Sequence, residues 1–533
     1  MQLKKFFSNL CFNTVYTIIS YLSQQQSFVM RKTSFFLLSA LIYSSLSIAQ
    51  PSFVNDSLDS YIAQGMKDWN IPGLAIAIVK DGQVVMMKGY GVRNLETKEP
   101  VDENTLFMIA SNSKLFTGTA LAQLDNNNKL SLNDKITKYF PDYRVYDSCT
   151  TQLVTIKDML GHHLGTKTFQ GDFTFWNSSL SRGEIMSKMR YLKPSQNFRA
   201  SYGYCNSCFL TAGEVIPKVT GKPWEVYVYD SIMEPLEMAH THPLGQGMSE
   251  MPDAATPYTN TFSAELKQLP YDNVDNLAPA GSIVSCVNDL THWIIMQLDS
   301  GRYNGKQVLQ WPVLQKTRDA NTLISTRKNG FTPTHFVAYG LGVFVKDYYG
   351  KQLYEHTGGA DGFVTNVCFV PEEKLGITIL TNNDNQEFFE LLRHQILDAY
   401  LGVPYINRSK TVLGRFNQER KKNLDSINAL KARVKGNKPA FPLQNYTGTY
   451  SNQLFGDIQI STSGNNLKIT FSNHRSLTAT LQYMDNNQWL MTYSNPAFGI
   501  FPLIFKTEGN KIISTDVKVN DFLEFDPYTF IKQ

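Results

Sequence analysis

The chain has 533 residues, of which 42% are hydrophobic and 18% are charged, and its formal net charge is +4. This length is too great for one core of ordinary size, so two folded units and a linker are expected. The composition excludes a disordered protein. Residues 1–49 contain four basic residues and no acid, so the rest of the chain is neutral overall. Electrostatics therefore gives no reason to expect nucleic acid or an anionic membrane as a partner.

The first 49 residues are predicted not to belong to the folded protein. Residues 30–49 have a basic start at Arg31 and Lys32, a short apolar stretch and small residues before Gln50, which is typical of a cleaved secretory signal. Residues 1–29 are predicted to be an upstream extension. Because the apolar stretch is short for a membrane span, no stable span is expected after cleavage, and the protein is expected to be secreted or periplasmic. An uncleaved membrane anchor is the alternative.

Helical and strand patterns follow one another along residues 50–401. A helix is predicted over 56–70, and a β-hairpin over 73–94, where two apolar runs flank Asp81-Gly82. A mainly helical and loop region follows to about residue 300. Strand patterns run from His335 to Asn383, and a helix closes this part over 387–401. Strands from both ends can join one antiparallel sheet with the helical insertion packed against it, which makes this an α+β domain.

The rest of the chain differs in pattern. Residues 402–442 are rich in Lys, Arg and Asn, and are predicted to be a linker with one amphipathic helix. Residues 443–533 consist of short strand patterns separated by turn residues, which indicates a separate small antiparallel β domain.

Five cysteines follow residue 49, an odd number that leaves at least one unpaired within a monomer. Cys205 and Cys208 have the spacing of a redox pair or of half a metal site. No second C-x-x-C and no His pair at ligand spacing accompanies them, so buried thiols are the favoured interpretation.

A serine and a lysine three residues apart on a helix lie on one face, which places an amine beside a nucleophilic hydroxyl. Burial can lower the pKa of such a lysine enough for it to act as a base. The chain contains two S-x-x-K patterns, Ser111–Lys114 and Ser325–Lys328. Ser111 follows an apolar run and opens a predicted helix, which suits a hydroxyl held at a helix N-terminus and facing a cleft. Ser325 is predicted to lie in a solvated loop.

Two further polar elements could complete such a site. Residues 204–206 are Tyr-Cys-Asn, in which a phenol can move a proton and an amide can hold a carbonyl group. Residues 356–359 are His-Thr-Gly-Gly in a predicted strand, where glycines let a substrate backbone approach and leave an edge N–H free. Each element on its own is also compatible with a purely structural role.

Together, in this order, the three elements resemble the serine β-lactamase and penicillin-binding protein superfamily, whose signature is S-x-x-K, S-D-N and K-T-G. The variants Y-x-N and H-T-G resemble the branch that contains AmpC-like β-lactamases, D-alanyl-D-alanine carboxypeptidases, D-aminopeptidases and related esterases. The segments 154–165, 219–242 and 279–301 agree with this resemblance. It implies a β-lactamase/transpeptidase-like fold, and residues 443–533 resemble the small β domain often appended to such hydrolases.

The resemblance implies a mechanism through an acyl-enzyme. Ser111 would be the nucleophile, and Lys114 and Tyr204 would share the acid–base work in an order that the sequence leaves open. The oxyanion hole would use the backbone N–H groups of Ser111 and Gly359. No metal or organic cofactor is implied. Four residues would bind substrate: Asn206, His356, Thr357 and Gly358.

One departure from the family pattern bears on the substrate. His356 stands where the family has a lysine, and a mostly neutral imidazole would hold a substrate carboxylate less firmly. We therefore expect weak β-lactam hydrolysis at best, and a D-amino-acid peptide or a small ester or amide as substrate, possibly derived from the cell wall. The alternatives are a true β-lactamase and a penicillin-binding sensor protein that does not turn over.

Overall fold

A computed structural model describes residues 50–328 and 332–533. The predicted upstream extension (1–29) and the predicted signal (30–49) lie outside these residues. Among the helices of the described ranges, none is both long enough and apolar enough to cross a bilayer. Residues 59–533 form one unit, which contains a helix-and-sheet domain and a closed β-barrel.

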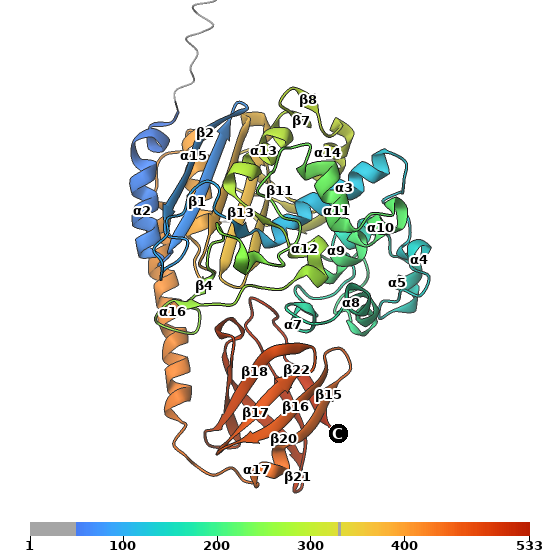
Figure 1. Cartoon of the computed structure of the whole chain (residues 1–533), viewed down its shortest axis with the longest axis vertical. Coiled ribbons are helices and arrows are strands. Elements are labelled where there is room, and N and C mark those ends of the chain that lie inside the picture. The colour runs from blue at the N-terminus through green and yellow to red at the C-terminus, as the bar shows by residue number, and fades with distance from the viewer. Residues whose placement is uncertain (1–49, 329–331) are drawn as a thin grey trace, which may run out of the picture. The chain divides into compact units, whose positions relative to one another are not determined.

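An eight-stranded antiparallel sheet is the centre of the first domain, in the order β2-β1-β14-β13-β12-β11-β10-β9 (Figure 1). Every side chain of β13 and β14 is buried, so both faces of the sheet are covered. The strands are β1 Gly73–Lys80, β2 Gln83–Gly91, β9 Thr322–Ser325, β10 Val337–Tyr339, β11 Phe344–Tyr348, β12 Lys351–Ala360, β13 Phe363–Val370 and β14 Leu375–Thr381.

The two ends of this domain meet in the sheet, as the sequence predicts. β1 and β2 form the predicted hairpin, and its turn residues Asp81 and Gly82 have φ values of 52° and 78°. Two consecutive positive φ angles are those of the tight turn that matches the twist of paired strands. β1 also pairs with β14, beginning at Leu74 opposite Thr381.

The predicted helical insertion lies between β2 and β9. In Figure 1 the sheet lies between α2 on one side and α3 and α11 on the other. Helices α13 and α15 pack directly on β13 and β14. The helices are α2 Leu58–Asp68, α3 Ser113–Asn126, α4 Ile136–Tyr139, α5 Ser148–Leu153, α6 Ile156–Leu160, α7 Asp172–Phe175, α8 Arg182–Lys188, α9 Asn206–Gly213, α10 Val215–Thr220, α11 Trp224–Val228, α12 Ala278–Gly281, α13 Val287–Leu298, α14 Trp311–Arg318 and α15 Phe388–Tyr400. Three two-stranded ribbons accompany them: β3 Phe107–Met108 with β6 Val284–Ser285, β4 Tyr258–Thr259 with β5 Lys267–Gln268, and β7 Arg302–Tyr303 with β8 Lys306–Gln307.

The edge strand β9 corrects one expectation. Ser325 was predicted to lie in a solvated loop, but it is the last residue of β9, and residues 326–328 are exposed beyond it. The strand has four residues, and Leu323 within it is 60% exposed. Such a short strand at a sheet edge shows too little alternation of apolar and polar residues to be recognised.

The stretch predicted as a linker contains the 25-residue helix α16, Arg408–Ala432. Its first turn is held on the sheet domain by an ion pair of 2.5 Å between Arg408 Nε and Asp398 Oδ2. Ser409 Oγ accepts a hydrogen bond of 2.8 Å from Trp69 Nε1. The N-terminal end of the helix is therefore fixed to the domain that precedes it.

The C-terminal residues form an antiparallel β domain, as predicted, and the structure closes it into an eight-stranded barrel. Closure leaves no exposed strand edge. A cluster of aromatic rings fills one part of its interior, including Tyr446, Trp489 and Phe505. After the short helix α17 Leu443–Tyr446, the strands are β15 Gly448–Asn452, β16 Gly456–Ser463, β17 Asn466–Phe471, β18 His474–Tyr483, β19 Gln488–Tyr493, β20 Ile500–Glu508, β21 Lys511–Val517 and β22 Tyr528–Lys532.

Candidate active site

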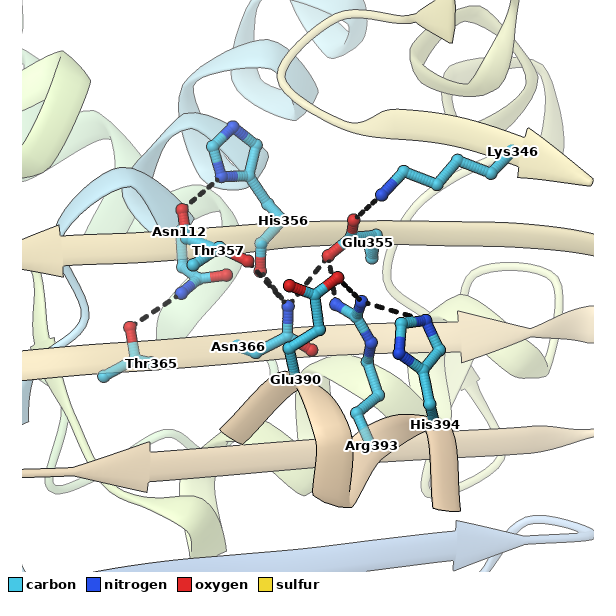
Figure 2. A network of polar contacts seen from close by, with 10 residues as sticks. All are labelled: Asn112, Lys346, Glu355, His356, Thr357, Thr365, Asn366, Glu390, Arg393 and His394. Carbon is cyan, nitrogen blue, oxygen red and sulfur yellow. Dashed lines mark hydrogen bonds and ion pairs between the residues drawn. The ribbon is translucent and has the colours of Figure 1, made fainter. Parts of the chain in front are cut away.

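Ser111 lies in a tight turn at the start of α3. Residues Ala110–Asn112 form one 3₁₀ turn that leads directly into the helix. Ala110 has a φ of 46°, a left-handed conformation that costs a residue with a side chain about 1–2 kcal/mol. Asn112 Nδ2 donates to Thr365 Oγ1 on β13 over 2.9 Å, which fixes the turn on the sheet (Figure 2). The strained residue therefore immediately precedes the predicted nucleophile.

Lys114 is fully buried, and its amine faces Ser111. Nζ lies 3.0 Å from Ser111 Oγ, 2.7 Å from Asn206 Oδ1 and 2.7 Å from the carbonyl oxygen of Ala280. Burial lowers the pKa of Lys114 to about 7, because the ammonium form loses its hydration. In the neutral amine, two N–H groups can donate to Asn206 and Ala280, which leaves the lone pair directed at the serine hydroxyl.

Tyr204 is the second side chain that contacts the hydroxyl of Ser111. Its hydroxyl donates to Ser111 Oγ over 2.7 Å. Burial raises the pKa of Tyr204 well above its ordinary value of about 10, so the phenol keeps its proton at neutral pH. The ring of His162 lies beside the phenol ring at 4.5 Å between centroids, and His162 Nδ1 accepts from the backbone N–H of Cys205 over 3.0 Å. His162 thus holds the segment that carries Tyr204.

Asn206 and Asp172 continue the chain of hydrogen bonds that begins at Lys114. Asn206 Nδ2 donates to Asp172 Oδ2 over 2.7 Å, while Asn206 Oδ1 accepts from Lys114. The amide predicted to hold substrate is thus already engaged on both sides by the protein, with one N–H remaining. Burial raises the pKa of Asp172 well above its usual range. No sequence motif marked Asp172, which lies in the short helix α7.

The predicted substrate strand is β12, and half of it has an open edge. β11 pairs with β12 only as far as Phe344 opposite Glu355. From His356 to Ala360, β12 pairs with β13 on one side, and no strand of the described ranges pairs with it on the other. Backbone N–H and C=O groups on that side can pair with an extended substrate. Thr357 lies on this segment, and its Oγ1 accepts from Asn366 Nδ2 over 3.1 Å, which leaves the hydroxyl proton free to donate.

His356, predicted to bind substrate, has both ring nitrogens engaged within the protein. Its Nδ1 lies 2.8 Å from the carbonyl oxygen of Thr357 and must donate to it, since a carbonyl only accepts. Nε2 then accepts from the hydroxyl of Tyr339, 2.9 Å away. Burial and the neighbouring charge of Lys114 lower the pKa of His356 to about 3. The imidazole is neutral, and both ring nitrogens bond within the protein, so the ring borders the pocket without an N–H for the substrate.

Gly358 and Gly359 are successive residues of β12, so side chains at these two positions would face opposite sides of the sheet. A side chain on Gly358 would come within 1.9 Å of the carbonyl oxygen of Ile109, so Gly358 lets the strand approach the turn that carries Ser111. Gly358 is not among the residues that line the pocket of Ser111, and its role in substrate binding stays a prediction. Gly359 borders the same pocket as Ser111, as the predicted oxyanion hole requires.

A buried ionic network centred on Glu355, a residue of β12, supports this strand (Figure 2). Glu355 pairs with Lys346 and with Arg393 Nη1, the latter at 2.5 Å. Burial alone would raise the pKa of Glu355, but the charges of Arg393 and Lys346 hold it well below its usual range. Asn366 Nδ2 joins this network to the substrate strand, donating to Glu355 Oε2 over 2.8 Å and to the carbonyl oxygen of His356 over 3.0 Å.

Ser111 opens into a pocket of about 420 Å³, a size that suits a small-molecule or peptide group. Among the described residues that line it, none is Lys or Arg, whereas three are acidic: Asp172, Asp361 and Asp384. Burial raises the pKa of Asp384 to about 7 and that of Asp361 well above its usual range. Much of the wall is apolar, formed by Phe169, Trp176, Phe344, Val364, Phe389, Phe522 and Leu523.

The cysteines of the described ranges are all free thiols, and all but Cys149 are buried. Cys205 and Cys208 are thus buried thiols, as favoured from the sequence. A hydrogen bond from Cys208 lowers the pKa of Cys205. Within residues 50–328 and 332–533, no group of three or more His, Cys, Asp or Glu side chains is arranged to hold a metal ion.

The structure thus brings Ser111, Lys114, Tyr204 and Asn206 together and places residues 356–359 beside them. A serine hydroxyl in contact with a buried amine and a phenol, beside an open strand edge, is the arrangement of an acyl-transferring serine hydrolase. Comparison with known proteins agrees with this class. Residues 58–401 match the Beta-lactamase family model, and the chain belongs to that family. Residues 432–530 match a domain of unknown function, DUF3471.

Individual proteins show the same relationship. The chain is 28% identical over 374 residues to "Protein flp" of Staphylococcus aureus (strain MRSA252), across 68% of this chain and 70% of that protein. It is 25% identical over 377 residues to "Unguisins hydrolase ungD" of Aspergillus violaceofuscus (strain CBS 115571), across 65% of each. An octameric penicillin-binding protein homologue from Pyrococcus abyssi has the same fold, with a TM-score of 0.56 and 21% identity over 89% of this chain and 99% of that one.

Proposed function

We propose that this protein hydrolyses esters or amides through an acyl-enzyme on Ser111, and that its substrates carry no carboxylate near the reacting carbonyl. The observation that carries the proposal is the contact of Ser111 Oγ with Lys114 Nζ at 3.0 Å and with Tyr204 Oη at 2.7 Å, at the mouth of a pocket beside an open strand edge. Membership of a hydrolase-containing family supports the reaction class.

The steps follow from the protonation states of the two partners. Lys114, whose pKa is lowered to about 7, takes the proton of Ser111 as its oxygen attacks the carbonyl carbon. The backbone N–H groups of Ser111 and Gly359 stabilise the oxyanion. Tyr204, whose pKa is raised, gives its proton to the leaving group and regains one from the Lys114 ammonium, which becomes neutral again. Water then attacks the acyl-enzyme and gives a proton to Lys114, which passes it to Ser111 Oγ as the acid leaves, so that the serine hydroxyl is restored.

The absence of Lys and Arg among the described residues that line the pocket favours one class of substrate. No Lys or Arg of the described residues lines the pocket, His356 is neutral, and three carboxyl groups border it. A penicillin or a peptide with a free C-terminal carboxylate would bring a negative charge to a pocket whose lining holds no Lys or Arg within the described ranges, and Lys114 acts as the base only in its neutral form. A neutral ester or amide, or a peptide with a free amino group, meets no such penalty. This favours an esterase or aminopeptidase activity over a carboxypeptidase or β-lactamase activity.

A panel of substrates tests the proposal. It consists of p-nitrophenyl esters, D-alanine and L-alanine p-nitroanilides with free amines, a D-alanyl-D-alanine peptide with a free carboxylate, and a chromogenic cephalosporin. We expect turnover of neutral or amine-bearing substrates, a preference for the D-anilide, and little or no turnover of the two carboxylates. Preferential hydrolysis of the cephalosporin would instead identify a β-lactamase, and covalent labelling without turnover a sensor protein.

Two serine variants make the test specific. Ser111→Ala is expected to abolish hydrolysis of every substrate. Ser325→Ala is the matched control, because Ser325 begins the other S-x-x-K pattern of the chain and lies at the edge of the sheet in β9. It is expected to retain full activity. Hydrolysis that persists in Ser111→Ala would refute the proposed mechanism.

A further inference from the structure

The loop between β21 and β22 of the barrel, residues 518–527, reaches the pocket of the sheet domain. Phe522 and Leu523 of this loop line the pocket together with Ser111. Phe522 lies directly over the substrate strand, because a side chain added to Gly359 would come within 2.5 Å of its ring. Phe522 is 42% exposed, so its ring is not part of a barrel core. The ring instead lines the active-site pocket.

The loop is held in this position by a buried carboxylate. Glu524 is 3% exposed and accepts hydrogen bonds from the backbone N–H groups of Gly171, at 3.1 Å, and Phe173, at 2.9 Å. Tyr528 Oη also lies 2.9 Å from its carboxylate oxygens. The residue between the two N–H groups is Asp172, which contacts Asn206 and borders the pocket. The loop is therefore fixed on the same short helix that contributes an active-site carboxyl.

Further contacts flank this anchor. Lys167 Nζ pairs with Asp526 Oδ2 over 2.7 Å, and the rings of Phe169 and Phe525 lie 5.8 Å apart. At a separate point of the barrel, His474 Nε2 lies 3.0 Å from the carbonyl oxygen of Trp176. Phe169 and Trp176 both line the pocket. The barrel thus contacts the wall-forming segment of the sheet domain at both of its ends.

We propose that the barrel loop 518–527 is a wall of the active site, and that Phe522 is a specificity-determining residue which selects substrates with a bulky apolar group beside the reacting carbonyl. This inference rests on the proposed acyl-enzyme hydrolysis and names the substrate class more closely. The physical reason is that an apolar acyl group would be buried against the ring of Phe522 and the other aromatic side chains that line the pocket, whereas an acetyl group offers little apolar surface to bury there.

The test compares p-nitrophenyl acetate with p-nitrophenyl phenylacetate in the full chain. In the wild type we expect a higher kcat/KM for the phenylacetate. In Phe522→Ala we expect kcat/KM for the phenylacetate to fall about tenfold or more, and that for the acetate to stay unchanged. Phe522→Leu keeps an apolar side chain and is expected to restore part of the preference. Ile504→Ala, at a barrel position that is 47% exposed and outside the pocket lining, is the control and is expected to behave as the wild type.

A binding measurement keeps this test independent of turnover. Phenylacetamide is titrated calorimetrically into Ser111→Ala and into Ser111→Ala with Phe522→Ala, and the second protein is expected to bind about tenfold more weakly. Unchanged affinity together with an unchanged ester preference in Phe522→Ala would overturn the inference while leaving the proposed function intact. Esterase activity that survives in Ser111→Ala would refute the proposed function, and the affinity comparison would still decide the role of the loop.

Discussion

The loss of a proton from Lys114 should switch the enzyme on near neutral pH. Burial lowers the pKa of this amine to about 7, and only the neutral form can take the proton of Ser111. With that pKa, about 90% of the amine is neutral at pH 8, about half at pH 7 and about 1% at pH 5. The value of kcat/KM should therefore fall about tenfold per unit as the pH decreases below about 6. Because burial raises the pKa of Tyr204, its ionisation should cause no loss of activity up to pH 9.

The assay is kcat/KM for a neutral ester between pH 5 and 9, since such a substrate does not itself titrate. Lys114→Met removes the amine without adding bulk, and should lower kcat/KM by about 10²–10⁴-fold. It should also abolish the acid limb, which is the decrease of kcat/KM toward low pH. Lys328→Met, in the other S-x-x-K pattern, is the matched control and should leave the profile unchanged. An acid limb with a midpoint near 4, or the same limb in Lys114→Met, would show that a different group is the base.

Three further predictions concern the groups around the nucleophile. Tyr204→Phe removes the hydroxyl that contacts Ser111, so kcat/KM should fall about 10²–10⁴-fold while the acid limb near pH 7 remains. Gly358→Ala would place a methyl group 1.9 Å from the carbonyl oxygen of Ile109, and the resulting shift of β12 should reduce kcat/KM for every substrate and cost about 1–3 kcal/mol in the free energy of unfolding by urea. Glu355→Gln removes the buried counter-charge of Arg393, which keeps only the half-exposed Glu390 at 3.0 Å, and should cost about 3–5 kcal/mol in the same measurement.

The contribution of Glu355 to the free energy of unfolding should depend on pH. The folded-state pKa of Glu355 is lower than its unfolded value, so its stabilising contribution is present above the unfolded pKa of about 4.3 and is lost as the pH falls toward the folded value. The unfolding free energy of the wild type should thus decrease below about pH 4.3 more steeply than that of Glu355→Gln. Parallel curves for the two proteins would contradict the ion-pair interpretation. For Gly358→Ala and Tyr204→Phe, wild-type kcat/KM would contradict the assigned positions.

The parts of the site that could be predicted are those with a local geometric rule. A serine and a lysine three residues apart at a helix start face the same way, which anticipates the contact between Ser111 and Lys114. The hairpin at Asp81-Gly82 follows from its turn residues, and the closing strands follow from apolar runs separated by turns. These rules predict the fold class because the strand patterns at the two ends of residues 50–401 can join one sheet.

The rest depends on contacts between distant residues, which no local pattern reports. Phe522 meets Gly359 across more than a hundred residues, and Glu524 meets the backbone around Asp172 across more than three hundred. The close approach of Ile109 to Gly358 is likewise a contact between residues that lie far apart in the chain. His356 is in the expected strand, but its nitrogens are taken up by Tyr339 and by its own backbone, which only the packed structure determines.

The most direct test of the central claim is to trap the acyl-enzyme. The protein is mixed with a p-nitrophenyl ester, quenched in acid within the first turnovers and digested for peptide mass spectrometry. The acyl-enzyme mechanism predicts an added acyl mass on the peptide that contains Ser111, and on Ser111 itself after fragmentation, with no adduct in Ser111→Ala. Ester hydrolysis with no acyl mass on that peptide, or with an adduct on another residue that persists in Ser111→Ala, would contradict it.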